Sequence, residues 1–242
     1  MDIEPTFISS IHSYIRSTRA TRRGARVRPN DAPVGLHKEY LRMPRIPLPA
    51  AENLAMSLGA AMDTRASSMN CNADRALSLS ELGTLLGHAL GMRAGLSRHY
   101  PSGGGMYPIE TYLIGAVLED HSPGVFHYHP KAHALEQLWD VPADFRMGDV
   151  LRAANVPLAP ILVVFTSVWD RSAIKYGDFA YSHGLLEAGH MAQNILLAAT
   201  AMNIGARPVS GCDDAVVNDL LDLDGFSEQP VYSITLCPPR AA

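Results

Sequence analysis

The sequence predicts an α+β fold in which helices pack on one mostly antiparallel sheet. Strand-like and helix-like segments mix along the 242 residues without the strict strand–helix repetition of a parallel sheet. Apolar residues make up 47% of the chain, which is enough for a packed core. The segment 184–203 has apolar residues on more than half of its helical circumference, so we expect a largely buried helix there.

The first elements follow an irregular start. Residues 1–50 predict an arm without long regular elements, because five prolines lie between positions 29 and 49. Within this arm, residues 37–49 predict an extended strap. Residues 50–64 predict a helix with Leu54, Leu58 and Met62 on one face. A clearer helix is predicted over 78–92, with Ser80 close to its start.

The strands come later in the chain. Their predicted ranges are a buried strand at 111–118, a hairpin formed by 124–130 and 133–139, a mid-sheet strand at 159–169 and a last strand at 229–237. A short amphipathic helix is expected at 213–223. We therefore expect a basic, proline-rich arm over 1–50 and a single domain over 51–242.

Charge is spread unevenly. Residues 1–50 hold nine basic and four acidic residues, a balance of +5, and the remainder of the chain carries −9. We expect the arm to pack on its own acidic body or on a partner subunit, and not on nucleic acid, since no binding-fold signature accompanies the basic cluster. No apolar run reaches about 18 residues, which predicts no membrane partner. No secretory signal pattern is present and the three cysteines lie far apart, which predicts no disulfide framework and a cytoplasmic location.

A glycine-rich loop precedes the strand predicted at 111–118. Its residues 100–108 read Tyr-Pro-Ser-Gly-Gly-Gly-Met-Tyr-Pro, and glycines let backbone N–H groups approach a ligand closely. The loop is not a phosphate-binding Walker motif, because no Gly-Lys-Ser/Thr follows, and it is not a dinucleotide fingerprint, because no strand precedes it and no helix follows. A flexible turn without a ligand is the alternative.

Three further segments carry ligand-binding or catalytic residue types. Residues 65–68 offer an arginine and two hydroxyls that could bind a phosphate, although an ordinary helix end reads the same way. Residues 207–211 predict a tight turn that presents backbone N–H groups and a hydroxyl. In residues 175–178, adjacent Lys175 and Tyr176 could act as base and acid, with a solvated loop lysine as the alternative.

Two histidine patterns do not predict a metal site. His183, Glu187, His190 and Asn194 share one helix face, but a carboxylate-bridged di-metal site needs two such motifs on facing helices. His127, His129 and His133 could form a zinc trio, yet surface histidines of a hairpin are the interpretation we favour. We therefore expect no metal cofactor.

The segments together, in this order, resemble the FMN-dependent nitroreductase superfamily. The matching motifs are Arg-x-Ser, Pro-Ser-Gly-Gly-Gly-x-Tyr-Pro, Lys-Tyr-Gly and Glu-Ala-Gly-His-x-Ala-Gln-Asn, with HYHPKAHALEQL similar to the family's hairpin. The branch they resemble is the SagB-type dehydrogenases, which oxidise azolines to thiazoles and oxazoles in modified peptides. The likeness covers roughly residues 50–240. It implies a nitroreductase-like fold whose homodimer interface holds two FMN molecules.

The resemblance also implies where FMN binds. Arg65 and Ser67 match the residues near the ribityl chain and phosphate. The family usually has a basic residue two positions later, but this chain has Met69, which leaves Arg207 or Arg240 to supply the cation. The loop that passes beside the flavin from the partner subunit is matched by Ser102, Gly103, Gly104 and Gly105. The turn whose backbone N–H can bond flavin N5 is matched by Pro208, Ser210 and Gly211.

The same resemblance implies the activity. Lys175 and Tyr176 match the pair that this branch is thought to need for azoline oxidation, in which a base removes a Cα proton and flavin takes a hydride. We expect a homodimer that acts on a peptide-derived or small-molecule ring alongside biosynthetic partner enzymes. Two alternatives stay open: a nitro- or quinone reductase that uses NAD(P)H, and a non-catalytic flavin-binding subunit that docks partners through residues 16–28.

Overall fold

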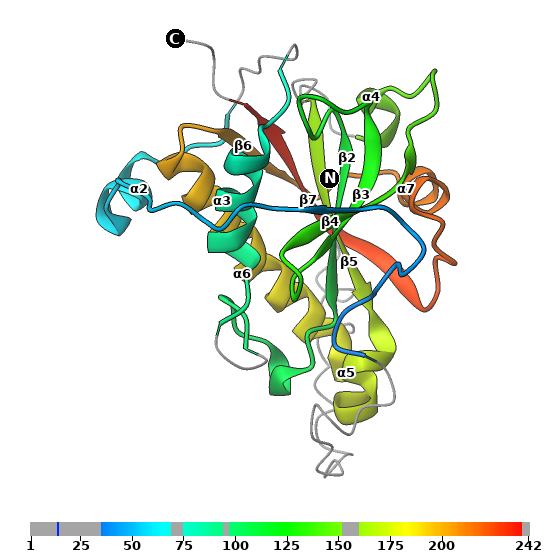
Figure 1. The fold of residues 1–242 in the computed structure, drawn as a ribbon. Helices are drawn as coiled ribbons and strands as arrows, with labels where there is room; N and C mark the ends of the chain where they lie inside the picture. The colour runs from blue at the N-terminus through cyan, green and yellow to red at the C-terminus, as the bar shows by residue number, and fades with distance from the viewer. Residues whose placement is uncertain (1–13, 15–34, 69–74, 94–96, 152–159, 239–242) are drawn as a thin grey trace, which may run out of the picture.

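The core of the molecule is a seven-stranded sheet, as seen in a computed structural model that describes residues 14, 35–68, 75–93, 97–151 and 160–238 (Figure 1). The strand order is β1-β4-β3-β2-β5-β7-β6, and every neighbouring pair is antiparallel. The strands are β1 (Arg45–Pro47), β2 (Ile109–Gly115), β3 (Gly124–His129), β4 (Ala134–Asp140), β5 (Ile161–Val168), β6 (Gly205–Val209) and β7 (Glu228–Cys237). The predicted α+β class with a mostly antiparallel sheet is confirmed.

Helices cover both faces of this sheet. They are α2 (Leu58–Thr64), α3 (Leu79–Leu90), α4 (Met147–Val150), α5 (Trp169–Tyr176), α6 (Ala180–Ala201) and α7 (Asp214–Leu221), with 3₁₀ turns η2 (Gly103–Gly105) and η3 (Gly177–Phe179). Alternate residues of β5 enter two cores, Val163 and Phe165 on the side of α3 and α6, and Leu162 and Val164 on the side of α7. The predicted mid-sheet strand, hairpin and long helix are thereby confirmed.

Three local predictions differ from the structure. The helix expected at 50–64 begins only at Leu58, because the Ser57 hydroxyl accepts a hydrogen bond from Ala60 N (3.2 Å) and starts the helix there. The helix expected at 78–92 runs only from Leu79 to Leu90, because Ser78 caps it in a reciprocal capping box with Glu81, and Ser80 lies close to its start as expected. The turn expected at 207–211 begins inside edge strand β6, where Pro208 is tolerated because an edge strand does not need every N–H in a ladder.

The predicted strap does run extended across the sheet (Figure 1). Its β1 residues pair with β4. Lys38 Nζ donates to Glu228 Oε2 (2.7 Å), and Arg45 donates to Glu136 Oε1 (2.6 Å). The described part of the basic arm thus packs on acidic groups of its own body, as expected, while the boundary at residue 50 stays a prediction.

Two further findings bear on the sequence expectations. Among the described helices, none combines the length and the apolar character needed to cross a bilayer. Cys237, at the end of β7, is disulfide-bonded, whereas Cys212 is free. A disulfide at Cys237 is therefore present although the three cysteines lie far apart in sequence, and one such bond is not the disulfide framework that the sequence argues against.

Candidate functional site

The glycine-rich loop lies against the end of α5. Gly104 adopts φ +64°, and a Cβ placed there would lie 2.5 Å from both Lys175 Nζ and Tyr176 OH. Lys175 and Tyr176 lie at the end of helix α5 and not in a loop, and both are half-buried. Two segments that are far apart in sequence therefore meet within one chain, at a position that only glycine can occupy without displacing them.

The loop's conformation is fixed at its base. The Ser102 hydroxyl accepts a hydrogen bond from Tyr107 N (2.8 Å), and the Tyr107 hydroxyl accepts one from Arg98 N (3.1 Å). Tyr107 is buried and has φ +46°, a conformation that costs a non-glycine residue about 1–3 kcal/mol. These contacts hold the strained loop in place beside Lys175.

Helix α6 supplies the side chains under the loop. The His183 ring lies 4.3 Å from the Tyr176 ring, centroid to centroid, and a Cβ placed on Gly103 would lie 3.1 Å from the His183 ring. One helical turn later, Glu187 is buried, and this burial raises its pKa to about 7, against the opposing effects of Ser102 and Arg98. A carboxyl group with this pKa can hold or release a proton near neutral pH.

A second group of expected site residues lies around β6. The backbone of Ser68 donates to Ala206 O (3.1 Å), which places the segment of Arg65 and Ser67 beside the start of β6 and near Arg207. At the other end of β6, Val209 and Ser210 line a cavity of about 270 Å³, with Trp169 and Tyr181 among its other walls. Pro208 lies within the strand and Gly211 directly follows Ser210.

The donor set of this second group fits FMN. At one end, Arg65, Ser67 and Arg207 offer two guanidinium groups and a hydroxyl, which suit a phosphate. At the other end, exposed Ser210 lies beside a cavity with aromatic walls, which suits a ring. From Ala206 to Ser210 an extended strand spans about 13 Å, which matches an elongated cofactor. Met69 and Arg240 lie outside the described residues, so the source of the second cation stays a prediction.

Within one chain, Lys175 and Tyr176 lie apart from Arg65 and Arg207, whereas Ser210 shares its cavity with Trp169, the first residue of α5, and with Tyr181 near the start of α6. Figure 1 shows α5 beside the start of α6, and α2 and β6 beside its end. Helix α6 has 22 residues, so it is about 33 Å long. The structure therefore places the glycine-rich loop, with Ser102, Gly103, Gly104 and Gly105, beside Lys175 and Tyr176. It joins Arg65 and Ser67 to β6 and the residues that follow it.

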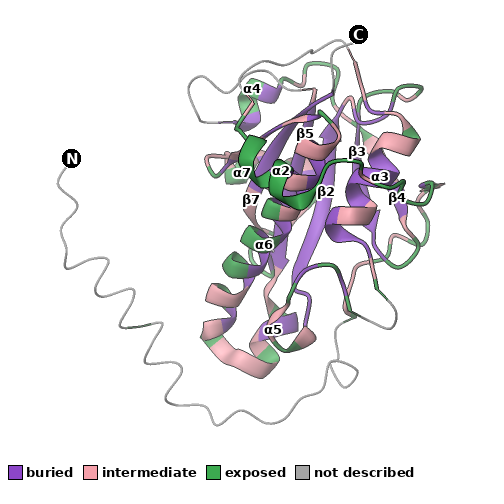
Figure 2. Ribbon diagram, turned by 90° about the vertical axis from the view of Figure 1, so that its left-hand side faces the viewer, coloured by how far each residue is buried: buried purple, intermediate pink, exposed green. Residues whose placement is uncertain are grey.

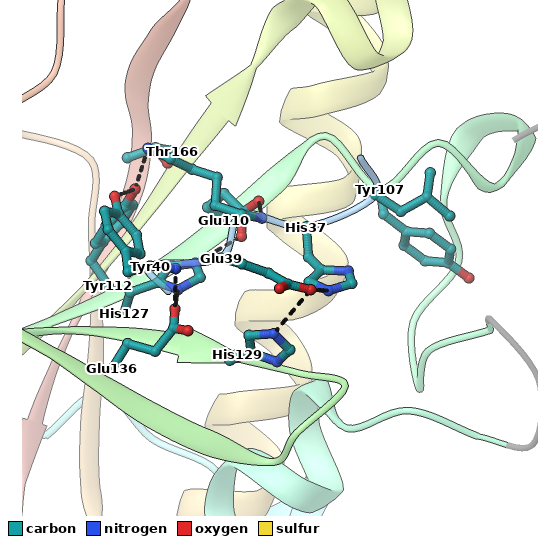
Figure 3. Close-up of polar contacts among 12 residues, drawn as sticks. His37, Glu39, Tyr40, Tyr107, Glu110, Tyr112, His127, His129, Glu136 and Thr166 are labelled. Atoms are coloured by element: carbon teal, nitrogen blue, oxygen red, sulfur yellow. Dashed lines mark hydrogen bonds and ion pairs between the residues drawn. The ribbon is translucent and has the colours of Figure 1, made fainter. Parts of the chain in front are cut away.

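Sequence reasoning missed a buried charge network under the strap (Figure 3). His127 lies between two buried carboxylates, 3.0 Å from Glu110 Oε2 and 2.9 Å from Glu136 Oε2. Glu110 also pairs with buried Arg171 of α5. Polar residues at positions within otherwise apolar strands were the signal that could have revealed it.

The pKa values of this network shift in opposite directions. Burial works against charge at Glu110, but Arg171 and His127 hold the pKa of that carboxyl far below its usual range. Burial opposes charge at His127 as well, yet its two carboxylate partners raise the pKa of the imidazole. The network is thus a set of mutually compensating charges.

Two of the three hairpin histidines are not surface residues, so the interpretation favoured from sequence is wrong for His127 and His129, while His133 is half-buried. His127 and His129 are buried, because the strap covers this part of the sheet. His129, His37 and Glu39 place possible ligand atoms within 4.8 Å of one another (Figure 3). However, His129 Nδ1 accepts a hydrogen bond from Ala132 N (3.0 Å), so neutral His129 carries its proton on Nε2, the nitrogen that faces Glu39. That tautomer cannot bind a metal through Nε2.

Known proteins resemble this chain in architecture and in sequence. The model of the nitroreductase family matches residues 63–236. The Methanocaldococcus jannaschii nitroreductase homologue MJ1384 is 28% identical over 152 residues, which cover 62% of this chain and 77% of the relative. The Escherichia coli microcin B17-processing protein McbC is 31% identical over 143 residues, covering 55% of this chain and 52% of McbC, so the match spans about half of that relative.

A solved structure has the same fold across nearly the whole chain. A chain of the E. coli microcin synthetase McbBCD complex, with truncated pro-MccB17 bound, superposes with a TM-score of 0.61 and 21% identity. The superposition covers 99% of this chain and 95% of that one. The chain therefore belongs to the nitroreductase family, and its likeness to McbC supports the SagB-type branch of that family.

Proposed function

We propose that the protein is an FMN-dependent dehydrogenase that oxidises an azoline, or a related peptide-derived ring, to the azole in natural-product biosynthesis. The observation that carries this proposal is the approach of Lys175 and Tyr176 to Gly104 in a chain related to McbC, a microcin-processing protein. The substrate would be a peptide or a small molecule derived from one, and biosynthetic enzymes would be the partners.

The residues have distinct roles in this proposal. Azoline oxidation removes a proton from Cα and a hydride from the neighbouring ring carbon. The chemistry that FMN supplies when bound is acceptance of the hydride. Lys175 takes the Cα proton on Nζ, and Tyr176 orients the ring through its hydroxyl. Arg65, Ser67 and Arg207 hold the phosphate, with Arg240 as a further candidate cation.

Pro208, Ser210 and Gly211 would hold the other end of the cofactor. Ser210 lines the cavity, and its backbone N–H would donate to a flavin ring bound there. The loop residues Ser102 to Gly105 would close over the ring from the opposite side, because their small side chains allow close approach.

We also propose that the active unit is a homodimer. The catalytic pair lies near the start of α6 and the phosphate-binding group lies near its end, so the two groups do not touch within one chain (Figure 1). Large apolar residues of α6 and α2 are exposed, including Leu186 at 61% and Leu58 at 64%, and Figure 2 marks exposed stretches on both helices. Exposed apolar residues at this density favour burial in a subunit interface.

The function is tested with Lys175→Ala. We expect the purified protein to be yellow with releasable FMN, and the variant to keep the cofactor while azole formation falls about 10²–10⁴-fold, as on loss of a general base. Absorption spectra and mass analysis of the product provide the measurement. A colourless protein, or full activity in the variant, contradicts the proposal. NAD(P)H-dependent nitroaromatic reduction without azoline oxidation supports the reductase alternative instead.

The composite site is tested by mixing two inactive variants. Lys175→Ala and Arg65→Ala each damage a different half of the site, so refolding or co-expressing them together should restore about one intact site in each mixed dimer. The measurement is azole formation by the mixture compared with each variant alone. No recovery in a confirmed mixed dimer contradicts the two-chain site.

A further inference from the structure

A buried arginine lies one helical turn before Lys175. Arg171 is 2% exposed and shares with Lys175 the α5 face that lies against the glycine-rich loop, because residues four apart lie on the same side of a helix. Its Nη1 donates to Tyr107 O (3.1 Å), and its Nη2 pairs with Glu110 Oε1. Tyr107 lies near the end of the loop, and Glu110 is the second residue of β2, the strand that follows it.

These two contacts connect α5 to the loop at a second place. At the tip, Lys175 Nζ and Tyr176 OH meet Gly104. At the base, Arg171 binds the carbonyl of Tyr107, whose N–H and hydroxyl are already held by Ser102 and Arg98. Rotation or sliding of α5 relative to the loop would break the base contacts and move Lys175 away from the tip.

A guanidinium suits this task better than an apolar residue would. A buried ion pair often stabilises a fold no more than well-packed apolar side chains do. The planar guanidinium, however, fixes the directions of its hydrogen bonds. The one side chain addresses a carbonyl of the loop and a carboxylate of β2 together. Glu110 is itself held by Lys38 N (2.7 Å) and His127 Nε2 (3.0 Å), so the carboxylate that pairs with Arg171 has a fixed position.

We propose that Arg171 is a positioning residue, with Glu110 as its counter-ion, that holds Lys175 and Tyr176 against the glycine-rich loop. The inference rests on the proposed function, in which Lys175 is the base. Arg171 acts through Lys175 and does not itself touch the substrate. Its loss should lower kcat about 10- to 100-fold with little change in KM, because a displaced base slows the chemical step more than binding.

Selective lysine labelling tests the positioning separately from catalysis. The chain has three lysines, Lys38, Lys131 and Lys175. Limited acetylation with acetic anhydride, followed by peptide mass spectrometry, reports the accessibility of each. Lys131 is exposed and serves as the reference, while Lys38 is ion-paired to Glu228 and should react slowly throughout. Arg171→Met should raise acetylation of Lys175 at least about fivefold relative to Lys131, since the helix end is released.

Two milder variants keep the test decisive. Arg171→Lys retains the charge but cannot reach both partners, and Glu110→Gln retains the shape but removes the counter-charge. Both should raise Lys175 labelling and lower kcat while the melting transition stays cooperative and FMN stays bound. Unchanged Lys175 labelling in a folded variant overturns the proposal. Raised labelling in a protein whose wild type oxidises no azoline upholds the positioning and refutes the proposed function.

Discussion

Glu136→Gln is expected to lower the free energy of unfolding by about 3 kcal/mol, the scale for removing one partner of a buried charge pair. Glu136 is fully buried on β4 and accepts hydrogen bonds from Arg45 (2.6 Å), His127 (2.9 Å) and Tyr40 N (3.2 Å). Two of these donors belong to the strap. Losing the carboxylate therefore removes one of the two negative charges beside His127 and loosens the strap. Denaturant unfolding measures the loss of stability, and faster tryptic cleavage at Arg42 or Arg45 reports the loosened strap.

The same difference in stability should depend on pH. Burial alone would raise the pKa of Glu136, but the hydrogen bonds from His127 and Arg45 lower it to about 2, from a usual value of 4.5. A lowered folded-state pKa stabilises the protein above the usual pKa, and this contribution is lost as the pH falls towards the folded-state value. The gap between wild type and Glu136→Gln should therefore narrow from pH 4.5 towards pH 2.

A surface carboxylate provides the control for this experiment. Glu119 is 45% exposed and accepts a hydrogen bond from Arg75 (3.2 Å). Exposed ion pairs contribute about 1 kcal/mol or less, so Glu119→Gln should leave the stability nearly unchanged. Equal effects of the two substitutions would show that burial of the network contributes nothing.

Gly104→Ala is expected to reduce turnover about 100-fold while the protein stays folded. The added methyl group would lie 2.5 Å from Lys175 Nζ and Tyr176 OH, so both side-chain ends must move away. Because these are the far ends of side chains, the fold can adjust, whereas the placement of the base cannot be kept. Steady-state azole formation and a thermal melt of the same sample measure the two effects.

A control with the same backbone strain separates the effect of that strain from the effect of displacing Lys175 and Tyr176. Gly225 has the same φ of +64°, and a Cβ there would meet the Asn218 amide nitrogen at 2.7 Å. Gly225→Ala should therefore lower stability by a similar amount, about 1–2 kcal/mol for the left-handed conformation, without a comparable loss of turnover. If both variants lose activity equally, the Gly104 contact with Lys175 is not what matters.

Local patterns were sufficient for most of the elements. The continuous apolar run of β5 and the wide apolar face of α6 predict a mid-sheet strand and a buried helix, and both lie where expected. Hydrogen bonds between near neighbours shift the helix ends from their predicted positions, as the caps Ser57 and Ser78 do for α2 and α3. The start of β6 was missed because an edge strand containing Pro208 has the composition of a turn.

The order of the elements, the family likeness and the residue types at the candidate site can all be predicted from the amino-acid sequence. Which of those residues meet depends on the three-dimensional packing. The tip of the glycine-rich loop reaches Lys175 within one chain, while Arg65 and Arg207 lie near the far end of α6. The Glu110, His127 and Glu136 network likewise depends on the pairing of β3 with β2 and β4. Side-chain periodicity fixes the face that a strand buries, but contacts between distant segments follow from register and packing, which no local pattern encodes.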